Sequence, residues 1–287
     1  MMGALQKNKG ADDMENENMY RKMVVIFVDL LGTKNNKRFE DKFLIHRLFH
    51  EEVKTNERRN MGHVIYDRKV YSFSDCAYFF YYYKEEIEDD RKDDMKLIQI
   101  AMYNTSISLL RILNAGYLVR GGISFGDAYF DELGFFGPAV EETYELESGY
   151  ADVPMVALSP KLGKMFYEWE ESETDMEIVN MLMSSRPMLV EKEEDKYFLN
   201  IFYQLERFLP VVALENECIE LNEVIRNINS VIWRDKEKYK DKQIKKEKIK
   251  STIYEKLDWF EKYLQTKHNR INSDTVAGGY SGIILSD

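Results

Sequence analysis

Two aspartates of this 287-residue chain lie in surroundings where a charged side chain is costly. Asp29 lies near the end of the otherwise apolar run MVVIFVDLLG at residues 23–32. Asp75 lies within the aromatic stretch VYSFSDCAYFFYYY at residues 70–83. An unpaired carboxylate there costs several kcal/mol, so each needs a cation or strong hydrogen-bond donors nearby. If the two segments are neighbouring strands, the carboxylates meet at one edge of a sheet and repel each other unless divalent cations lie between them. Such a pair could hold the metal ions of a phosphoryl-transfer site.

Gly32 and Thr33 come shortly after Asp29, just before a predicted helix. The exposed amides and the positive dipole end of that helix could receive phosphate groups. A structural role, in which Asp29 and Asp75 are helix-cap or turn carboxylates, fits the spacing equally well. The residues alone therefore leave both interpretations open.

The apolar patterns predict an α+β fold that can bring these residues together. The elements follow the order strand, helix, hairpin, helix, strand, helix, strand. This order is typical of a ferredoxin-like fold, with a mainly antiparallel sheet and helices packed on one face. The predicted segments are a strand at 23–32, a helix at 37–54, a hairpin at 70–83, a helix at 97–113, a strand at 117–125, a helix at 136–149, a strand at 153–158, a helix at 160–166 and a second hairpin at 188–202.

The C-terminal third has a different pattern. Apolar residues recur every three or four positions over 214–232 and again over 249–264, which predicts an antiparallel helical hairpin. For the Lys-rich segment that joins them, 234–250, we favour a solvated helix face over a site for an anionic partner. The expected organisation is a disordered leader (1–20), an α+β domain (21–205), the helical hairpin (206–270) and a flexible tail (271–287).

Composition limits the classes of function. The chain has 40 Lys and Arg residues against 51 Asp and Glu, a formal net charge of −11, whereas a sequence-independent nucleic-acid binder has a basic footprint. Two cysteines are too few for a disulfide framework or a Cys-rich zinc site. No apolar run approaches the ~18 residues that span a bilayer, and the N-terminus has no apolar signal-peptide core. We expect a cytoplasmic protein with neither a membrane nor a nucleic acid as partner.

Several common catalytic motifs are absent from the sequence, among them the P-loop, the G-x-S-x-G elbow and the H-E-x-x-H zinc motif. The glycine cluster at residues 121–126 lacks the spacing of a dinucleotide-binding loop, so we interpret it as a close approach of backbones. His46 and His50 lie one helical turn apart without a third ligand, which favours an ordinary, partly exposed pair over a metal site. Cys76 is expected to point away from Asp75 as a small buried hydrophobe.

Three segments carry a resemblance to a known family. FVDLLGT at 27–33, SFSDC at 72–76 and VRGGISFGDAYFDELGFFGPAVEETYELES at 119–148 resemble, in this order, the core of the class III nucleotide cyclases. Within that superfamily the chain looks like the pyrimidine cyclases of bacterial anti-phage defence, the Pycsar system. The resemblance extends over residues 23–203.

The resemblance implies a cyclisation reaction. A nucleoside triphosphate would be converted to a 3′,5′-cyclic monophosphate and pyrophosphate, with two Mn²⁺ or Mg²⁺ ions held by Asp29, Asp75 and the Leu30 carbonyl. It also implies a homodimer, because class III active sites are shared across the subunit interface, and a separate effector protein that detects the product. Arg120 is our candidate for a phosphate contact, with a structural ion pair as its alternative.

The departures from purine cyclases concern base recognition. Where those enzymes carry a base-reading Lys or Glu, four residues before the second metal aspartate, this chain has Tyr71, and their second base-reading position is Pro138. Their later Asn and Arg correspond to Glu141 and Glu145. A tyrosine ring takes up space in the pocket and can stack on or hydrogen-bond a smaller base, which fits a pyrimidine. An ordinary core aromatic is the alternative role for Tyr71.

We therefore expect a metal-dependent uridylate cyclase that converts UTP to cyclic UMP as an alarm signal during phage infection. A cytidylate cyclase, which makes cyclic CMP from CTP, is the close alternative because both bases fit beside a tyrosine. A second alternative is a catalytically inactive cyclase-like domain that binds a nucleotide or a partner protein. The replaced Asn and Arg favour this alternative, and the retained Asp29 and Asp75 oppose it.

Overall fold

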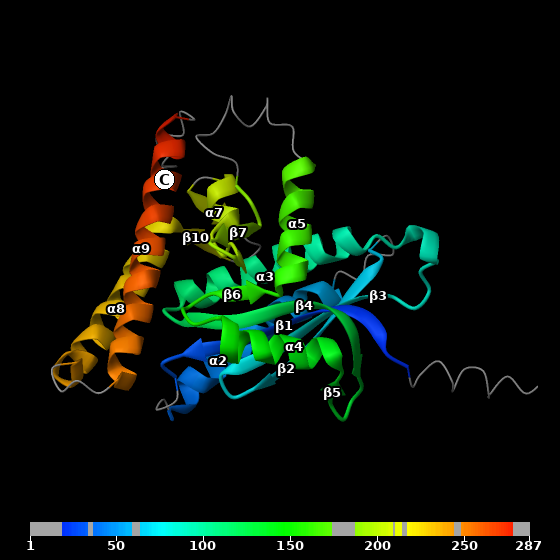
Figure 1. The fold of residues 1–287 in the computed structure, drawn as a ribbon, viewed down its shortest axis with the longest axis horizontal. Helices are drawn as coiled ribbons and strands as arrows, with labels where there is room; N and C mark the ends of the chain where they lie inside the picture. The colour runs from blue at the N-terminus through cyan, green and yellow to red at the C-terminus, as the bar shows by residue number, and fades with distance from the viewer. Residues whose placement is uncertain are drawn as a thin grey trace, which may run out of the picture.

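An eight-stranded sheet forms the centre of the protein, whose computed structural model describes residues 19–33, 37–58, 64–173, 187–208, 210–213, 217–243 and 248–277 (Figure 1). The strands of this sheet are β1 (Arg21–Leu31), β2 (Tyr66–Phe73), β3 (Cys76–Tyr83), β4 (Leu118–Phe130), β5 (Phe135–Phe136), β6 (Val156–Leu158), β7 (Val190–Glu193) and β8 (Lys196–Leu199). A separate two-stranded sheet pairs β9 (Val211–Ala213) with β10 (Cys218–Glu220).

Helices cover the sheet and form the C-terminal region. They are α2 (Phe39–Arg58), α3 (Asp94–Asn114), α4 (Pro138–Glu145), α5 (Pro160–Ser172), α7 (Tyr203–Phe208), α8 (Leu221–Gln243) and α9 (Lys248–Ala277), with the short segments η1 (Asp89–Arg91) and η2 (Leu146–Tyr150). Among the described residues, no helix is long and apolar enough to cross a membrane.

The order of the strands identifies the architecture. The sheet runs β2-β3-β1-β4-β6-β8-β7, with β5 attached to β4. Its first four strands are antiparallel neighbours, joined through α2 and α3 in the βαββαβ order of a ferredoxin-like unit. β6 joins β4 in parallel, and the β7–β8 hairpin extends the sheet beyond it. The predicted α+β fold, with a mainly antiparallel sheet and a C-terminal pair of helices, is therefore confirmed.

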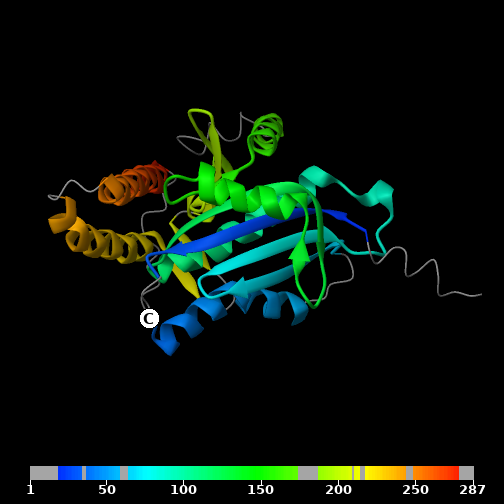
Figure 2. The same cartoon turned by 60° about the horizontal axis from the view of Figure 1, so that its bottom comes forward.

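β1 is apolar along most of its length because helices cover both faces of the sheet around it. Val24, Ile26 and Val28 pack in the cluster formed with α2 and α3, whereas Met23 and Val25 pack in the cluster formed with α4. All five side chains are fully buried, as expected for a strand covered on both faces. Figure 2 shows α2 and α4 on opposite sides of the sheet, so α4 is an addition to the predicted arrangement of helices on one face.

The C-terminal region differs from the prediction at both ends of its helical pair. Cys218 lies in the short strand β10 rather than in a helix, and α8 begins only at Leu221. At the other end, α9 continues to Ala277, past the predicted start of the tail, because Ile271 is buried in the main core. Residues 1–18 of the predicted leader and the final residues of the predicted tail lie outside the described part of the chain.

A buried charged cluster fixes α9 to the sheet domain. The Lys267 side chain is 2 % exposed and forms ion pairs with Glu206 of α7, at 2.8 Å, and with Glu191 of β7. Arg270 is a second cation beside Glu206, at 3.3 Å, and Asn200 donates a hydrogen bond to the same carboxylate at 2.7 Å. Desolvating each charge costs several kcal/mol, so removing any one of the charged members leaves an uncompensated charge in the interior.

Gly121 and Gly122 let β4 pack tightly against its neighbours. A Cβ atom added to Gly121 would lie 2.1 Å from the Phe27 carbonyl oxygen of β1, and one added to Gly122 would lie 2.3 Å from the Thr143 carbonyl oxygen of α4. Both distances are far below van der Waals contact, so glycine is required at these two positions. The interpretation of this cluster as a close approach of backbones is confirmed.

Replacing Gly122 by alanine should therefore destabilise the protein, whereas the same change at Gly126 should not. A Cβ added to Gly126 would meet the Ala139 Cβ at an ordinary 3.6 Å. We expect Gly122→Ala to lower the free energy of unfolding by about 2 kcal/mol, because α4 and β4 must move apart to admit the methyl group. Gly126→Ala should change it by less than about 0.5 kcal/mol. Urea unfolding followed by circular dichroism measures both values, and equal stability of the two variants would contradict the close-packing assignment.

Candidate active site

Asp29 and Asp75 lie beside each other at one end of the sheet. Asp29 is near the end of β1 and pairs in register with Cys76, the first residue of β3. Asp75 is in the turn between β2 and β3, and its carbonyl oxygen accepts a hydrogen bond from the Leu30 backbone amide at 3.0 Å. The backbone itself therefore brings these two predicted site residues together.

The Asp29 carboxylate is in a partly buried, acidic environment. Burial makes the largest contribution to its raised pKa, followed by the charges of Glu147 and Asp75, and the Arg120 charge offsets only part of the rise. The resulting pKa of Asp29 is about 6, against an ordinary value of 3.8. A divalent cation would relieve the repulsion that keeps a proton on Asp29, so this charge environment fits a cation site.

The Asp75 carboxylate, by contrast, is stabilised in its ionised form. The Thr33 hydroxyl donates a hydrogen bond to Asp75 Oδ2, and the Lys42 ammonium of α2 lies 3.9 Å from the same oxygen. Burial alone would raise the pKa of Asp75, but hydrogen bonds from Thr33 and Ser74 and the charge of Lys42 outweigh burial and lower it. Thr33 is itself buried, and its hydroxyl lies 3.1 Å from the Leu30 carbonyl oxygen. Thr33 thus links the end of β1 to the hairpin turn.

Arg120 lies next to Asp29 and is paired with a different carboxylate. It is the residue of β4 directly opposite Asp29, so both side chains project from the same face of the sheet. Its guanidinium forms an ion pair with Glu147, whose side chain is 7 % exposed and belongs to the π-helical segment η2. The ion pair expected as the alternative role of Arg120 is therefore present. Glu147 was not among the predicted site residues, because its position depends on a π-helical turn for which the sequence offers no simple pattern.

Tyr71 is part of an aromatic cluster on the face of the sheet that α4 covers. Its ring centroid lies 5.1 Å from that of Phe135 and 5.9 Å from that of Phe80. Its hydroxyl donates a hydrogen bond to the Asp131 carbonyl oxygen, at the tip of the β4–β5 hairpin. The contacts expected of a core aromatic are thus present for Tyr71, which remains partly exposed.

Cys76 differs from the prediction of a small buried hydrophobe. The register pairs it with Asp29, so the two side chains share a face, and Cys76 is only half-buried. Its thiol donates to the Phe73 carbonyl oxygen at 3.1 Å. Burial, followed by the charges of Asp29 and Asp75, raises the pKa of Cys76. The prediction was wrong because it counted strand alternation from Asp75, which lies in the turn.

The oxygen atoms at this site suit a hard, hydrated divalent cation. Asp29 and Asp75 supply carboxylate oxygens and Leu30 a carbonyl oxygen, ligands that Mg²⁺ and Mn²⁺ both accept. Over the described ranges, no three His, Cys, Asp or Glu side chains converge on one point. His46 and His50 pack on each other instead, with ring centroids 4.6 Å apart. Since Mg²⁺ is usually held by one or two carboxylates together with substrate phosphates, an incomplete protein cage fits this ion.

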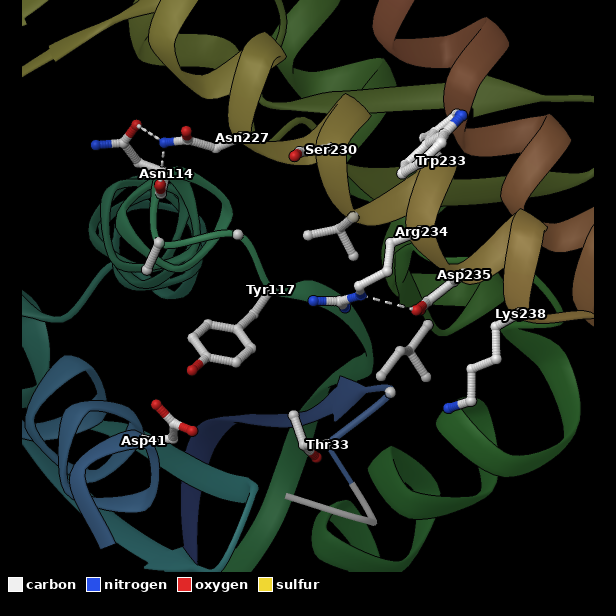
Figure 3. Close-up of a pocket in the computed structure, with 15 residues that line it drawn as sticks. Thr33, Asp41, Asn114, Tyr117, Asn227, Ser230, Trp233, Arg234, Asp235 and Lys238 are labelled. Atoms are coloured by element: carbon white, nitrogen blue, oxygen red, sulfur yellow. Dashed lines mark hydrogen bonds and ion pairs between the residues drawn. The ribbon is translucent and has the colours of Figure 1, made fainter. Parts of the chain in front are cut away.

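A cavity of about 830 Å³ adjoins the turn at Gly32 and Thr33 (Figure 3). It lies between this turn, the loop after α3 and the side of α8 that carries Arg234, Asp235 and Lys238. Gly32 has a φ of +81°, and a Cβ added there would lie 3.4 Å from Asp235 Oδ2. α8 therefore lies beside the turn whose Thr33 hydroxyl donates a hydrogen bond to Asp75.

No protein-family model and no curated protein matches the sequence. Solved structures similar to this chain include an adenylate/guanylate cyclase/hydrolase from Silicibacter pomeroyi, with 11% identity, a TM-score of 0.35 and coverage of 63% of this chain and 98% of that one. The guanylyl cyclase domain of the RhoGC fusion protein from Blastocladiella emersonii has 12% identity and a TM-score of 0.38, and the match covers 63% of this chain and 95% of that one. A third similar structure is the catalytic core of a rhodopsin-guanylyl cyclase with converted specificity, in complex with ATPαS. It has 12% identity and a TM-score of 0.36, and the match covers 63% of this chain and 95% of that one. Similarities at this level assign no activity, so the site is interpreted from its own geometry.

The raised pKa of Asp29 predicts how pH changes the stability of the metal-free protein. The folded state binds a proton at Asp29 more tightly than the unfolded chain does. The contribution of Asp29 to the free energy of unfolding therefore falls as the pH rises from 3.8 to about 6. Asp29→Asn should remove this contribution. The stability of Asp29→Asn relative to the unmodified protein should therefore increase over that pH window and stay constant above it.

Urea unfolding in the presence of EDTA, repeated at several pH values, measures this difference. Asp127→Asn is the matched control, because Asp127 is an exposed aspartate of β4. A pH dependence of the same size in both variants would show that the effect does not come from the surroundings of Asp29. A pH-independent difference for Asp29→Asn would show that the pKa of Asp29 is not raised by folding.

Proposed function

We propose that this chain is a nucleotide cyclase of the class III type, with Asp29 and Asp75 at its active centre. The observation that carries the proposal is the juxtaposition of these carboxylates at the end of β1 in a ferredoxin-like sheet. The motifs FVDLLGT, SFSDC and RGGIS-x-G, which resemble this family, lie at the same end of β1, at the β2–β3 turn and in β4.

The proposed reaction is an intramolecular phosphoryl transfer. A bond forms between the ribose 3′-oxygen and the α-phosphorus while the bond to the leaving oxygen breaks, which releases pyrophosphate and the hydroxyl proton. Two Mn²⁺ or Mg²⁺ ions, held by Asp29, Asp75 and the Leu30 carbonyl, would supply Lewis-acid activation and neutralise phosphate charge. Thr33 orients Asp75, and Arg120 adds positive charge beside Asp29.

The proposed substrate is UTP, with CTP as the close alternative. The resemblance makes Tyr71 and Pro138 correspond to the positions at which purine cyclases read the base, and Pro138 begins α4 without a side chain that can form a hydrogen bond. The aromatic cluster around Tyr71 favours a small base that stacks. The cyclic product would act as a second messenger in anti-phage defence and be detected by a separate effector protein.

We also propose that the protein is a homodimer, because exposed apolar side chains gather around the β4–β5 hairpin. Leu133 at its tip is 96 % exposed and Phe136 is 56 % exposed. Tyr20, with its ring centroid 6.0 Å from that of Phe136, extends the same surface. Contiguous apolar surface of this kind marks an interaction site. A second copy on this side of the sheet would complete the site around Asp29.

Leu133→Glu should therefore weaken the dimer. Placing a charge in an apolar interface costs several kcal/mol, so the monomer fraction should rise at micromolar protein concentration. Light scattering coupled to gel filtration measures the mass directly. Phe208→Glu is the control, since Phe208 is also exposed but lies on α7, away from β5 (Figure 1). Unchanged mass for Leu133→Glu, or equal dissociation of both variants, would reject this surface as the interface.

The catalytic assignment is tested by substitution of each aspartate. Asp29→Asn and Asp75→Asn should each lower cyclic nucleotide formation at least about 100-fold, because each removes a charge that stabilises the reacting phosphate through its bound cation. Asp127→Asn, the exposed control on β4, should keep full activity. Each variant is incubated with each of the four ribonucleoside triphosphates and Mn²⁺, and the products are identified by mass spectrometry.

We expect cyclic UMP from UTP. Cyclic CMP from CTP alone would identify a cytidylate cyclase, and a product from ATP or GTP alone would contradict the interpretation of Tyr71 and Pro138. Full activity of Asp75→Asn would reject the proposed centre. Stabilisation by a triphosphate and Mn²⁺ without any product would identify an inactive nucleotide-binding domain.

A further inference from the structure

α9 is held by aromatic residues against the sheet close to the candidate active site. Trp259 and Tyr263 pack in one cluster with Phe198 of β8 and with Tyr150 and Val153, at the end of η2 and just after it. The buried Lys267 cluster fixes the following turns of the helix. This part of α9 therefore has a defined position relative to η2.

Lys256 lies one helical turn before Trp259, on the same side of α9. It is half-buried, and the charges that act on it are those of Arg120, Asp152 and Glu147. Burial, followed by the Arg120 charge, lowers the pKa of Lys256, and the two carboxylates offset only part of this effect. A lysine from the C-terminal helix is thus near the Arg120–Glu147 ion pair.

Lys256 has no ionic partner of its own in the part of the chain that the structure describes, since neither a hydrogen bond nor an ion pair involves it there. The carboxylates near it are already paired, Glu147 with Arg120 and Asp152 with Lys196 at 2.8 Å. Arg120 has a buried Nε atom that also finds no hydrogen-bond partner among the described residues. A lysine without an ionic partner, beside a guanidinium whose side chain is 22 % exposed, is a binding position for an anion.

We propose that Lys256 and Arg120 bind the phosphate groups of the substrate beside Asp29. The inference rests on the proposed cyclase function, because it assigns the triphosphate to that same site. Arg120 is the register partner of Asp29, so an anion held between Arg120 and Lys256 lies next to that carboxylate. α4, on this face of the sheet, has the exposed carboxylates Glu141 and Glu145 and contains neither Lys nor Arg. The positive charge comes instead from β4 and from the C-terminal helix.

Inorganic tripolyphosphate tests this position without requiring turnover. Its affinity for the full chain in the presence of Mg²⁺ is measured by isothermal titration calorimetry. We expect Lys256→Met to weaken the affinity about tenfold, because it removes one charged hydrogen bond. The affinity of Lys256→Arg should remain within about threefold of that of the unmodified protein. Lys262→Met is the matched control, because Lys262 is an exposed lysine of the same helix, and it should change the affinity less than about twofold.

Equal tripolyphosphate affinity of Lys256→Met and Lys262→Met would overturn the inference, as would an unmodified protein that does not bind tripolyphosphate. Thermal unfolding shows whether Lys256→Met is folded, and Lys256→Gln is a second neutral variant with the same expected loss. The KM for the cyclised triphosphate should rise in parallel with the lost affinity.

The two proposals fail in different ways. If no triphosphate is cyclised but the Lys256 variants still lose tripolyphosphate binding, the proposed function fails and the anion position is supported. If cyclisation occurs while tripolyphosphate affinity and KM are unchanged in the Lys256 variants, only the anion position fails.

Discussion

The site depends on one constraint, a carboxylate at the end of a strand that is hydrogen-bonded along both edges. Because β3 and β4 both pair with β1, the neighbours of Asp29 are fixed as Cys76 and Arg120. The strand cannot rotate to place Asp29 in water without breaking both ladders, so the negative charge must be compensated where it lies. A proton, the Arg120 guanidinium or a bound cation can do this, and the rise of the Asp29 pKa to about 6 shows that Arg120 alone is insufficient.

The parts of the fold and site that could be predicted are those with a strong local pattern. The apolar run of β1, the aromatic β2–β3 hairpin and the apolar stripe of α3 each have their own periodicity, and tertiary contacts agree with it. Once these elements are ordered, the topology brings the turn at Asp75 to the end of β1 and thus next to Asp29. The close packing at Gly121 and Gly122 was also predictable, because two adjacent glycines weaken a strand unless a neighbouring backbone needs the space that side chains would fill.

The parts that could not be predicted depend on irregular or distant contacts. Glu147 pairs with Arg120 because the π-helical segment η2 places it there. Lys256 belongs to α9, far from Arg120 in the sequence. The start of α8 was missed because residues before Leu221 also fit a spacing of three and four, although Val212 and Ile219 are the buried residues of two short strands. At such places the spacing of apolar residues permits more than one structure, and the packing of neighbouring elements decides between them.

The buried cluster around Lys267 determines how far this chain can be divided. The expected boundary at residue 206 falls inside α7, and Glu206 is the carboxylate that both Lys267 and Arg270 neutralise from α9. A chain ending after α7 would keep this anion while losing its counter-ions, and it would uncover the core surface now occupied by Phe260. The sheet and the C-terminal helices are therefore not interchangeable modules.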